Sequence, residues 1–130
     1  PVRAHTGQDV VFVLAEERQV RQLRPEFASF PPLPRGVVVT APGDEVDFVS
    51  RFFAPGVGVP EDPVTGSAHA QLAPLWSAEL GRTELTARQL SRRGGALRVE
   101  VAGDRVLLIG RCRRYLDGVV ELDDRAVSPR

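Results

Sequence analysis

Three side chains that could take part in chemistry lie together in the middle of the chain. Asp62, Thr65 and Ser67 belong to the stretch EDPVTGSAH, which follows a run of prolines and glycines and leads into an apolar segment. That segment predicts a helix over residues 66–80, ended by Gly81. Because the first N–H groups of a helix have no partner within it and carry partial positive charge, this helix start predicts a site for a carboxylate or a phosphate.

Polar groups of the same loop would surround an anion bound there. Thr65 and Ser67 offer hydroxyls, and Gly66 and Ser67 offer backbone N–H groups. Asp62 adds a carboxylate, held in extended backbone by the proline that follows it. Two alternatives stay open: Thr65 or Ser67 only caps a core helix, and Asp62 only forms an Asx-type turn. Glu61 is not expected to pair with Asp62, since neighbouring residues of an extended segment point to opposite sides.

The other reactive residue types point away from cofactor chemistry. The chain has no lysine, so it can form neither a Schiff base with pyridoxal phosphate nor a P-loop. Cys112 is the only cysteine, which excludes an intrachain disulfide or a zinc cluster, and we expect it to be a small buried residue. His69 would lie in the first turn of the helix, where packing or capping is the expected role. We expect no cofactor and no metal ion.

The predicted elements make an α+β domain over residues 1–120, with residues 121–130 as a polar tail. The helix over residues 66–80 is apolar nearly all round, so we expect it to be buried, with Trp76 shielded from water. A short amphipathic helix is expected over residues 16–24 and a proline-rich loop over residues 25–34. Strands are predicted over residues 8–15, 36–41, 46–53, 85–91, 96–102 and 105–110, with one more possible over residues 111–120.

Composition limits the class of partner. Of the 130 residues, 42% are apolar and 26% charged, as in soluble globular domains, and the formal net charge is zero. Nothing indicates nucleic acid or a membrane as partner, because no apolar run approaches the roughly 20 residues of a spanning helix. No signal-peptide pattern opens the chain, so we expect a cytoplasmic protein. Arginine is used in place of lysine throughout, and alanine, valine, glycine and proline are abundant. This composition is typical of a GC-rich bacterial genome.

Charge is nevertheless uneven along the chain. Residues 44–62 hold five acidic residues and one arginine, whereas residues 81–114 hold nine arginines and three acidic residues. The basic residues are densest at Arg111, Arg113 and Arg114. We expect these to be a solvated strand end, and the alternative is a docking surface for an acidic partner.

The order of several motifs resembles a known family. EDPVTGSAH, with SRFFAPGVGVP before it and QLSRRGG and LRVEV after it, is similar to the phenazine-biosynthesis isomerase-like (PhzF-like) family from about Thr6 to Gly110. The resemblance covers only the second half of a typical member. It implies the diaminopimelate-epimerase-like fold, in which each of two similar domains wraps a curved sheet or barrel around a central helix and the active site lies between them.

The resemblance also implies a chemistry: cofactor-free proton transfer on a small carboxylate-bearing substrate. Asp62 and Ser67 would then be the catalytic residues of this half, with Thr65, Gly66 and Ser67 binding the substrate. The family's catalytic glutamate lies in the first half, to which nothing here corresponds, so whether the chain is an enzyme by itself stays open. The segment RCRRYLDGVVEL also departs from the family's usual Ala-Val-rich strand, which leaves the placement of that strand in doubt.

Two further readings compete with an isomerase half. The chain could be a non-catalytic domain that binds a small anion, or a domain that self-associates through the face that another half would cover. In either case an uncovered face predicts a partner, which would be a second copy in a homodimer or a separate first-half chain.

Overall fold

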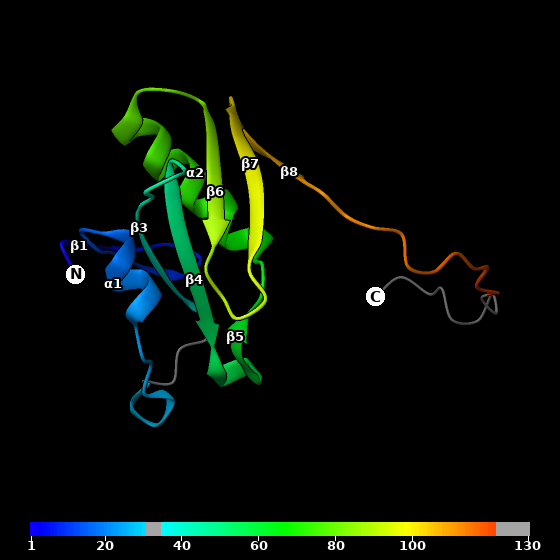
Figure 1. Cartoon of the computed structure of the whole chain (residues 1–130), viewed down its shortest axis with the longest axis horizontal. Helices are drawn as coiled ribbons and strands as arrows, with labels where there is room; N and C mark the ends of the chain where they lie inside the picture. The colour runs from blue at the N-terminus through cyan, green and yellow to red at the C-terminus, as the bar shows by residue number, and fades with distance from the viewer. Residues whose placement is uncertain (31–34, 122–130) are drawn as a thin grey trace.

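The computed structural model, which describes residues 1–30 and 35–121, is built on one mixed sheet with a helix on each face (Figure 1). The strands follow the order β1-β2-β3-β4-β6-β7-β8, and β5 pairs with β4 beside this path. The strands are β1 (Arg3–Thr6), β2 (Val10–Val13), β3 (Val37–Pro42), β4 (Phe48–Ala54), β5 (Val59–Asp62), β6 (Glu84–Gln89), β7 (Gly95–Ala102) and β8 (Arg105–Gly110). The helices are α1 (Glu17–Gln22) and α2 (Gly66–Leu80), with two 3-10 turns, η1 (Phe27–Ser29) and η2 (Pro55–Val57).

Strands β3 and β4 form the centre of the sheet because both of their faces are apolar. Phe48 and Phe52 of β4 join the core cluster that includes α2, whereas Val49 and Phe53 join the cluster that includes Val20 of α1. Successive side chains of a strand point to opposite faces, so apolar residues at adjacent positions fit a strand that is covered on both sides. The mixed α+β class is therefore confirmed, with one sheet and few helices.

Helix α2 begins and ends where the sequence predicts. It runs from Gly66 to Leu80, and Gly81 stops it in the left-handed conformation at φ 67°. Trp76 is 1% exposed, as expected, and its ring stacks on Phe48 with centroids 5.8 Å apart. Its indole N–H donates to Thr40 Oγ1 at 3.0 Å, so the buried polar edge is satisfied.

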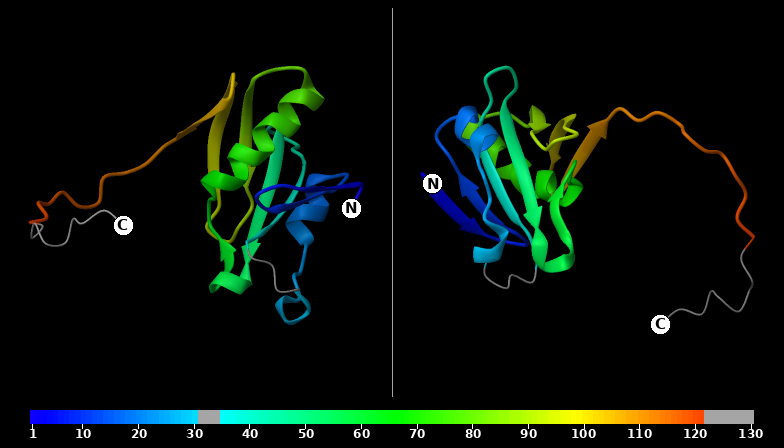
Figure 2. Two further views of the ribbon diagram at one scale, coloured as in Figure 1. Left: turned by 180° about the vertical axis from the view of Figure 1, so that it is seen from behind. Right: turned by 60° about the horizontal axis from the view of Figure 1, so that its bottom comes forward.

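The expectation that α2 is buried all round is wrong. The helix lies across one face of the sheet (Figure 2), and only its inner side is covered. Ala70, Pro74 and Ala78 on the other side are exposed. The apolar character of that side comes from small residues, which expose little apolar area and so lose little by facing water.

Two short strands escaped the sequence analysis. All four residues of β1 are exposed, so it carries no apolar alternation, and it is held by antiparallel pairing with β2. β5 pairs with β4 across a register shift, so Asp62 ends a strand rather than lying in an irregular loop. The other strands, α1 and the β7–β8 hairpin about Gly103 are confirmed within a few residues.

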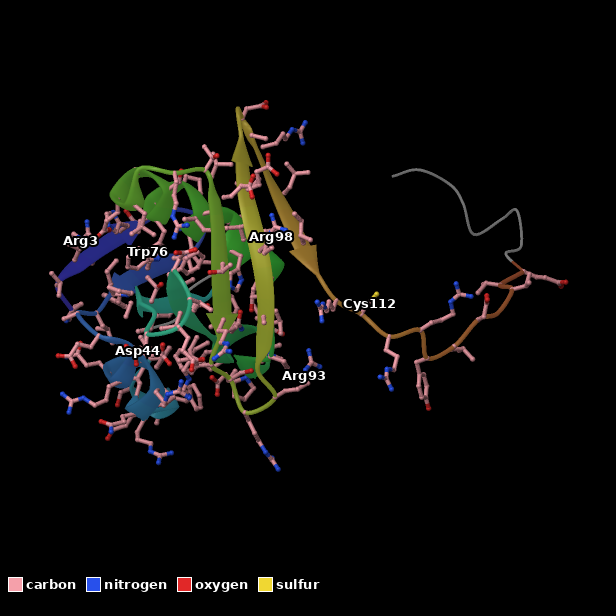
Figure 3. All side chains as sticks on the ribbon, turned by 45° about the horizontal axis from the view of Figure 1, so that its top comes forward. Arg3, Asp44, Trp76, Arg93, Arg98 and Cys112 are labelled. Atoms are coloured by element: carbon pink, nitrogen blue, oxygen red, sulfur yellow. The ribbon has the colours of Figure 1, made fainter. Side chains whose placement is uncertain are left out.

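The C-terminal end differs most from expectation. Residues 111–121, all of them described, form no strand and leave the sheet as an exposed segment (Figure 1), so the extra strand is wrong. Cys112 lies on this segment, exposed rather than buried (Figure 3). Among the described strands β1 and β8 are not paired with each other, so the sheet is open and not a closed barrel. Residues 122–130 of the tail predicted over residues 121–130, and residues 31–34 of the predicted proline-rich loop, lie outside the described residues.

Candidate functional site

A cavity of about 360 Å³ lies beside the start of α2. Its lining includes Asp62, Thr65 and Ser67, three residues singled out from the sequence. Gly66, which lies between Thr65 and Ser67 in the sequence, is the exposed first residue of α2. The apolar floor includes Phe52, and the far wall includes Asp9 and Arg35. The structure therefore brings the predicted site residues to one cavity.

Thr65 does not use its side chain to cap α2. It occupies the N-cap position with extended backbone, yet its hydroxyl makes no capping bond to any N–H group in the part of the chain that the structure describes. The hydroxyl donates to Asp62 Oδ2 instead. The alternative in which Thr65 only caps the helix is therefore wrong, and the positive end of α2 is left without a side-chain cap.

Gln89, which was not predicted from the sequence, holds the loop over residues 62–65 by hydrogen bonds from its side chain. Its side chain is buried at the end of β6, and its Oε1 accepts from the Thr65 N–H at 2.8 Å. Its Nε2 donates to the Asp62 carbonyl oxygen at 2.6 Å and to Thr65 Oγ1 at 3.1 Å. One signal was present in the sequence. Leu85, Ala87 and Gln89 alternate along the buried face of β6, so Gln89 is a polar residue at an apolar position.

His69 packs beneath the same loop, as expected from the sequence. Its ring is fully buried, with Nδ1 2.8 Å from the Thr65 carbonyl oxygen and Nε2 3.4 Å from Ser50 Oγ. Burial lowers the pKa of His69, and the hydrogen bond to the Thr65 carbonyl opposes this in part. The neutral ring carries its proton on Nδ1, because the carbonyl can only accept.

Glu61 points away from Asp62, as predicted. Arg51 holds it by two hydrogen bonds, at 2.7 Å and 3.1 Å, and also donates to the Leu23 carbonyl oxygen at 2.8 Å. The guanidinium lies 4.9 Å above the Phe53 ring. This pairing anchors β5 immediately before Asp62, and it leaves Asp62 as the carboxylate on the α2 side of the cavity.

The far wall of the cavity was not predicted. Asp9 Oδ1 accepts from the Gly36 N–H at 3.0 Å and from Arg35 Nε at 3.3 Å. The Gln71 amide of α2 binds the backbone N–H and carbonyl of Asp9, each at 3.0 Å. Asp9 Oδ2 is buried and has no partner among the described residues. Asp9 thus ties α2 to β2 and β3, and it brings a second carboxylate to the wall.

Within residues 1–30 and 35–121, no group of three or more His, Cys, Asp or Glu side chains is arranged to hold a metal ion. None of the helices in these residues is long and apolar enough to cross a membrane. Arg111, Arg113 and Arg114 lie exposed beyond the last strand, and Arg114 pairs with Asp117 at 3.0 Å, as a solvated end would.

A family model, two relatives and a solved structure all indicate the same protein family. The family model described as phenazine biosynthesis-like protein (PhzC-PhzF) matches residues 1–116. Two uncharacterized isomerases of Pseudomonas aeruginosa are 48% and 49% identical over 88% and 94% of the chain, which is 44% and 48% of their own lengths. The crystal structure of a phenazine biosynthesis PhzC/PhzF protein from Clostridium difficile superposes with a TM-score of 0.80 at 37% identity, over 92% of the chain and 47% of that protein. The chain therefore spans about half the length of the relatives it matches.

Proposed function

The chain belongs to the phenazine biosynthesis-like (PhzC-PhzF) family, and we propose that it forms the C-terminal half of a cofactor-independent isomerase of that family. The proposed reaction moves a proton on a small carboxylate-bearing substrate, from one carbon to another position of the same molecule. The observation that carries the proposal is the cavity in which Asp62, held by Thr65, lies beside the uncapped start of α2.

Each residue of this wall has a separate proposed role. The backbone N–H groups of Gly66 and Ser67 bind the substrate carboxylate, which the helix end attracts. Asp62 takes up or returns the proton, and the Ser67 hydroxyl supports the bound carboxylate. Both steps are proton transfers, so the proposed chemistry requires no cofactor.

The proposed site is incomplete in one chain. The isomerases that it resembles are about twice as long as this chain. We propose that a homodimer partner or a separate first-half chain covers it. Support comes from the exposed apolar side chains of β8, where Leu107, Leu108 and Ile109 are 41% to 47% exposed.

Asp62→Asn separates binding from chemistry. Replacing the carboxylate by an amide removes a negative charge beside the bound anion, so we expect benzoate to bind several-fold more tightly to the α2 start. The same change should abolish proton transfer to a dihydro-hydroxy aromatic acid when a first half is supplied. Ser67→Ala should weaken benzoate binding. Asp104→Asn, a matched change at the exposed β7–β8 turn, should alter neither measurement.

The results distinguish the proposal from its rivals. Binding with no proton transfer, even with a first half present, would favour a non-catalytic anion-binding domain. Self-association with no binding of benzoate would favour a purely structural domain, and would contradict the anion site.

A further inference from the structure

The amide of Gln89 can adopt only one orientation. Oε1 faces the Thr65 N–H, which can only donate, and Nε2 faces the Asp62 carbonyl oxygen, which can only accept. Turning the amide over would set N–H against N–H and oxygen against oxygen in a buried place, losing both hydrogen bonds. The donor and acceptor ends of Gln89 are therefore assigned by the chemistry of their partners.

This orientation fixes the direction of the Thr65 hydroxyl. Gln89 Nε2 also lies 3.1 Å from Thr65 Oγ1, and an amide nitrogen can only donate, so Oγ1 accepts there. The hydroxyl has one proton, and its other close neighbour is Asp62 Oδ2. That proton is consequently directed to Asp62, and the chain Gln89–Thr65–Asp62 runs in one direction.

The two oxygens of Asp62 are made unequal by this chain. Oδ2 receives the Thr65 hydroxyl, whereas Oδ1 has no hydrogen bond to any of the residues 1–30 and 35–121. A carboxylate with one oxygen occupied and one free accepts a proton at the free oxygen, in a position set by the bond to the other.

We propose that Gln89 is a positioning residue, which directs the Thr65 hydroxyl onto Asp62 Oδ2 and so leaves Oδ1 as the oxygen that exchanges a proton with the ligand. The role of Oδ1 rests on the proposed function. The direction of the hydrogen-bond chain does not, and it can be tested without turnover. A merely structural Gln89 would hold the backbone of the loop and leave the hydroxyl free to turn.

Two substitutions of Gln89 separate these roles. Gln89→Glu replaces the donating nitrogen by an oxygen that accepts, so the Thr65 hydroxyl should turn to the new carboxylate and leave Asp62. Gln89→Met removes the amide that donates to Thr65 Oγ1, so the hydroxyl is no longer directed and should spend part of its time away from Asp62. Thr65→Val has no hydroxyl and defines the signal of an Asp62 without this bond. Gln71→Met is the matched control, since it removes a half-buried amide with two backbone hydrogen bonds to Asp9.

The readout is the ¹³Cγ chemical shift of Asp62 in the complete chain. We expect Gln89→Glu to move it to the value seen in Thr65→Val and Gln89→Met to move it part of the way, while Gln71→Met leaves it near the wild-type value. The proposal is overturned if Gln89→Met leaves the signal at the wild-type value, or if Gln89→Glu leaves it unchanged.

A second measurement compares the wild type with Gln89→Met and therefore covers the case in which Gln89→Glu does not fold. The Thr65 hydroxyl proton should exchange with water at least about tenfold more slowly in the wild-type chain than in Gln89→Met. Equal exchange rates would contradict the proposal. Neither readout depends on isomerase activity, so a failure of the proposed function would leave the result on Gln89 intact.

Discussion

Around the start of α2, polar side chains are buried and bonded to one another, whereas at β8 and beyond it apolar side chains are exposed. Gln89 and His69 are at most 1% exposed, and their hydrogen bonds converge on Thr65. At the other end Ile109 is 44% and Tyr115 fully exposed. The first region is a bonded polar network, and the second is an exposed apolar edge, where we propose that another chain packs.

The comparison has a physical basis. Buried polar groups lower stability unless they are bonded, so a satisfied network fixes one arrangement of the loop. An exposed apolar edge strand has unpaired N–H and C=O groups as well as apolar side chains, and both favour pairing with another chain. The following predictions test whether the two regions differ in this way.

Substitution of Trp76 should change the free energy of unfolding more than any other substitution proposed here. Removing this buried indole leaves a cavity against Phe48 and takes away the N–H that donates to Thr40 Oγ1, although the Thr40 hydroxyl still donates to the Val49 carbonyl oxygen. Trp76→Ala should therefore lower the free energy of unfolding by about 3–5 kcal/mol. Leu116→Ala, a change of an 81% exposed residue in the C-terminal segment, should alter it by less than about 0.5 kcal/mol. Denaturant unfolding measures both. Equal effects would remove the distinction between the two regions.

Self-association should depend on the exposed edge. We expect the wild-type chain to associate at tens of micromolar, and Ile109→Asp to raise the dissociation constant by about tenfold or more without unfolding the chain. Val2→Asp, at the opposite end of the sheet, is the control and should not affect association, although Val2 is also exposed, at 66%. Sedimentation equilibrium measures this. A well-folded wild-type monomer at that concentration would contradict the prediction.

The buried histidine should make stability depend on pH. Because burial lowers the pKa of His69, the unfolded chain takes up a proton that the folded chain does not as pH falls through about 6.5. The free energy of unfolding should therefore fall from about pH 7.5 toward pH 5. His69→Gln should flatten this dependence, whereas His5→Gln in the exposed β1 should retain it. A wild-type slope in His69→Gln would show that another group titrates.

Anion binding should involve the smallest free-energy change of these predictions. Sulfate should shift the amide signals of residues 65–68 at millimolar concentrations and lose affinity as sodium chloride is added, since partial charges and a screened field provide the attraction. Signals of residues 115–121 should not move. Shifts confined to the arginine-rich residues 111–114 would place anion binding at the edge instead.

Local chemistry explains which elements the sequence could predict. Gly81 adopts the left-handed conformation that ends α2, and the apolar segment before it fixes the helix, so both bounds follow from neighbouring residues. Asp62 and Ser67 could be singled out for the same reason, because they lie within a few residues of the helix start. The exposed strand β1 has no pattern of its own, since only its pairing with β2 makes it a strand.

The parts of the site that were missed depend on contacts between distant residues. Gln89 reaches Asp62 and Thr65 from a strand more than twenty residues later, and Asp9 lines the cavity from the position just before β2. Their roles follow from the register of the sheet, which no local pattern encodes. Cys112 is exposed because the chain leaves the sheet after Gly110.

The central claim is that this chain binds the carboxylate at a prebuilt site but needs another half for the reaction. Adding a dihydro-hydroxy aromatic acid to the purified chain in D₂O tests both parts in one NMR experiment, through the amide shifts of residues 65–68 and deuterium uptake into the acid. We expect these amides to move and deuterium uptake to stay at the rate without protein. Rapid deuterium uptake by the chain alone, or an acid that binds without moving these amides, would contradict the claim.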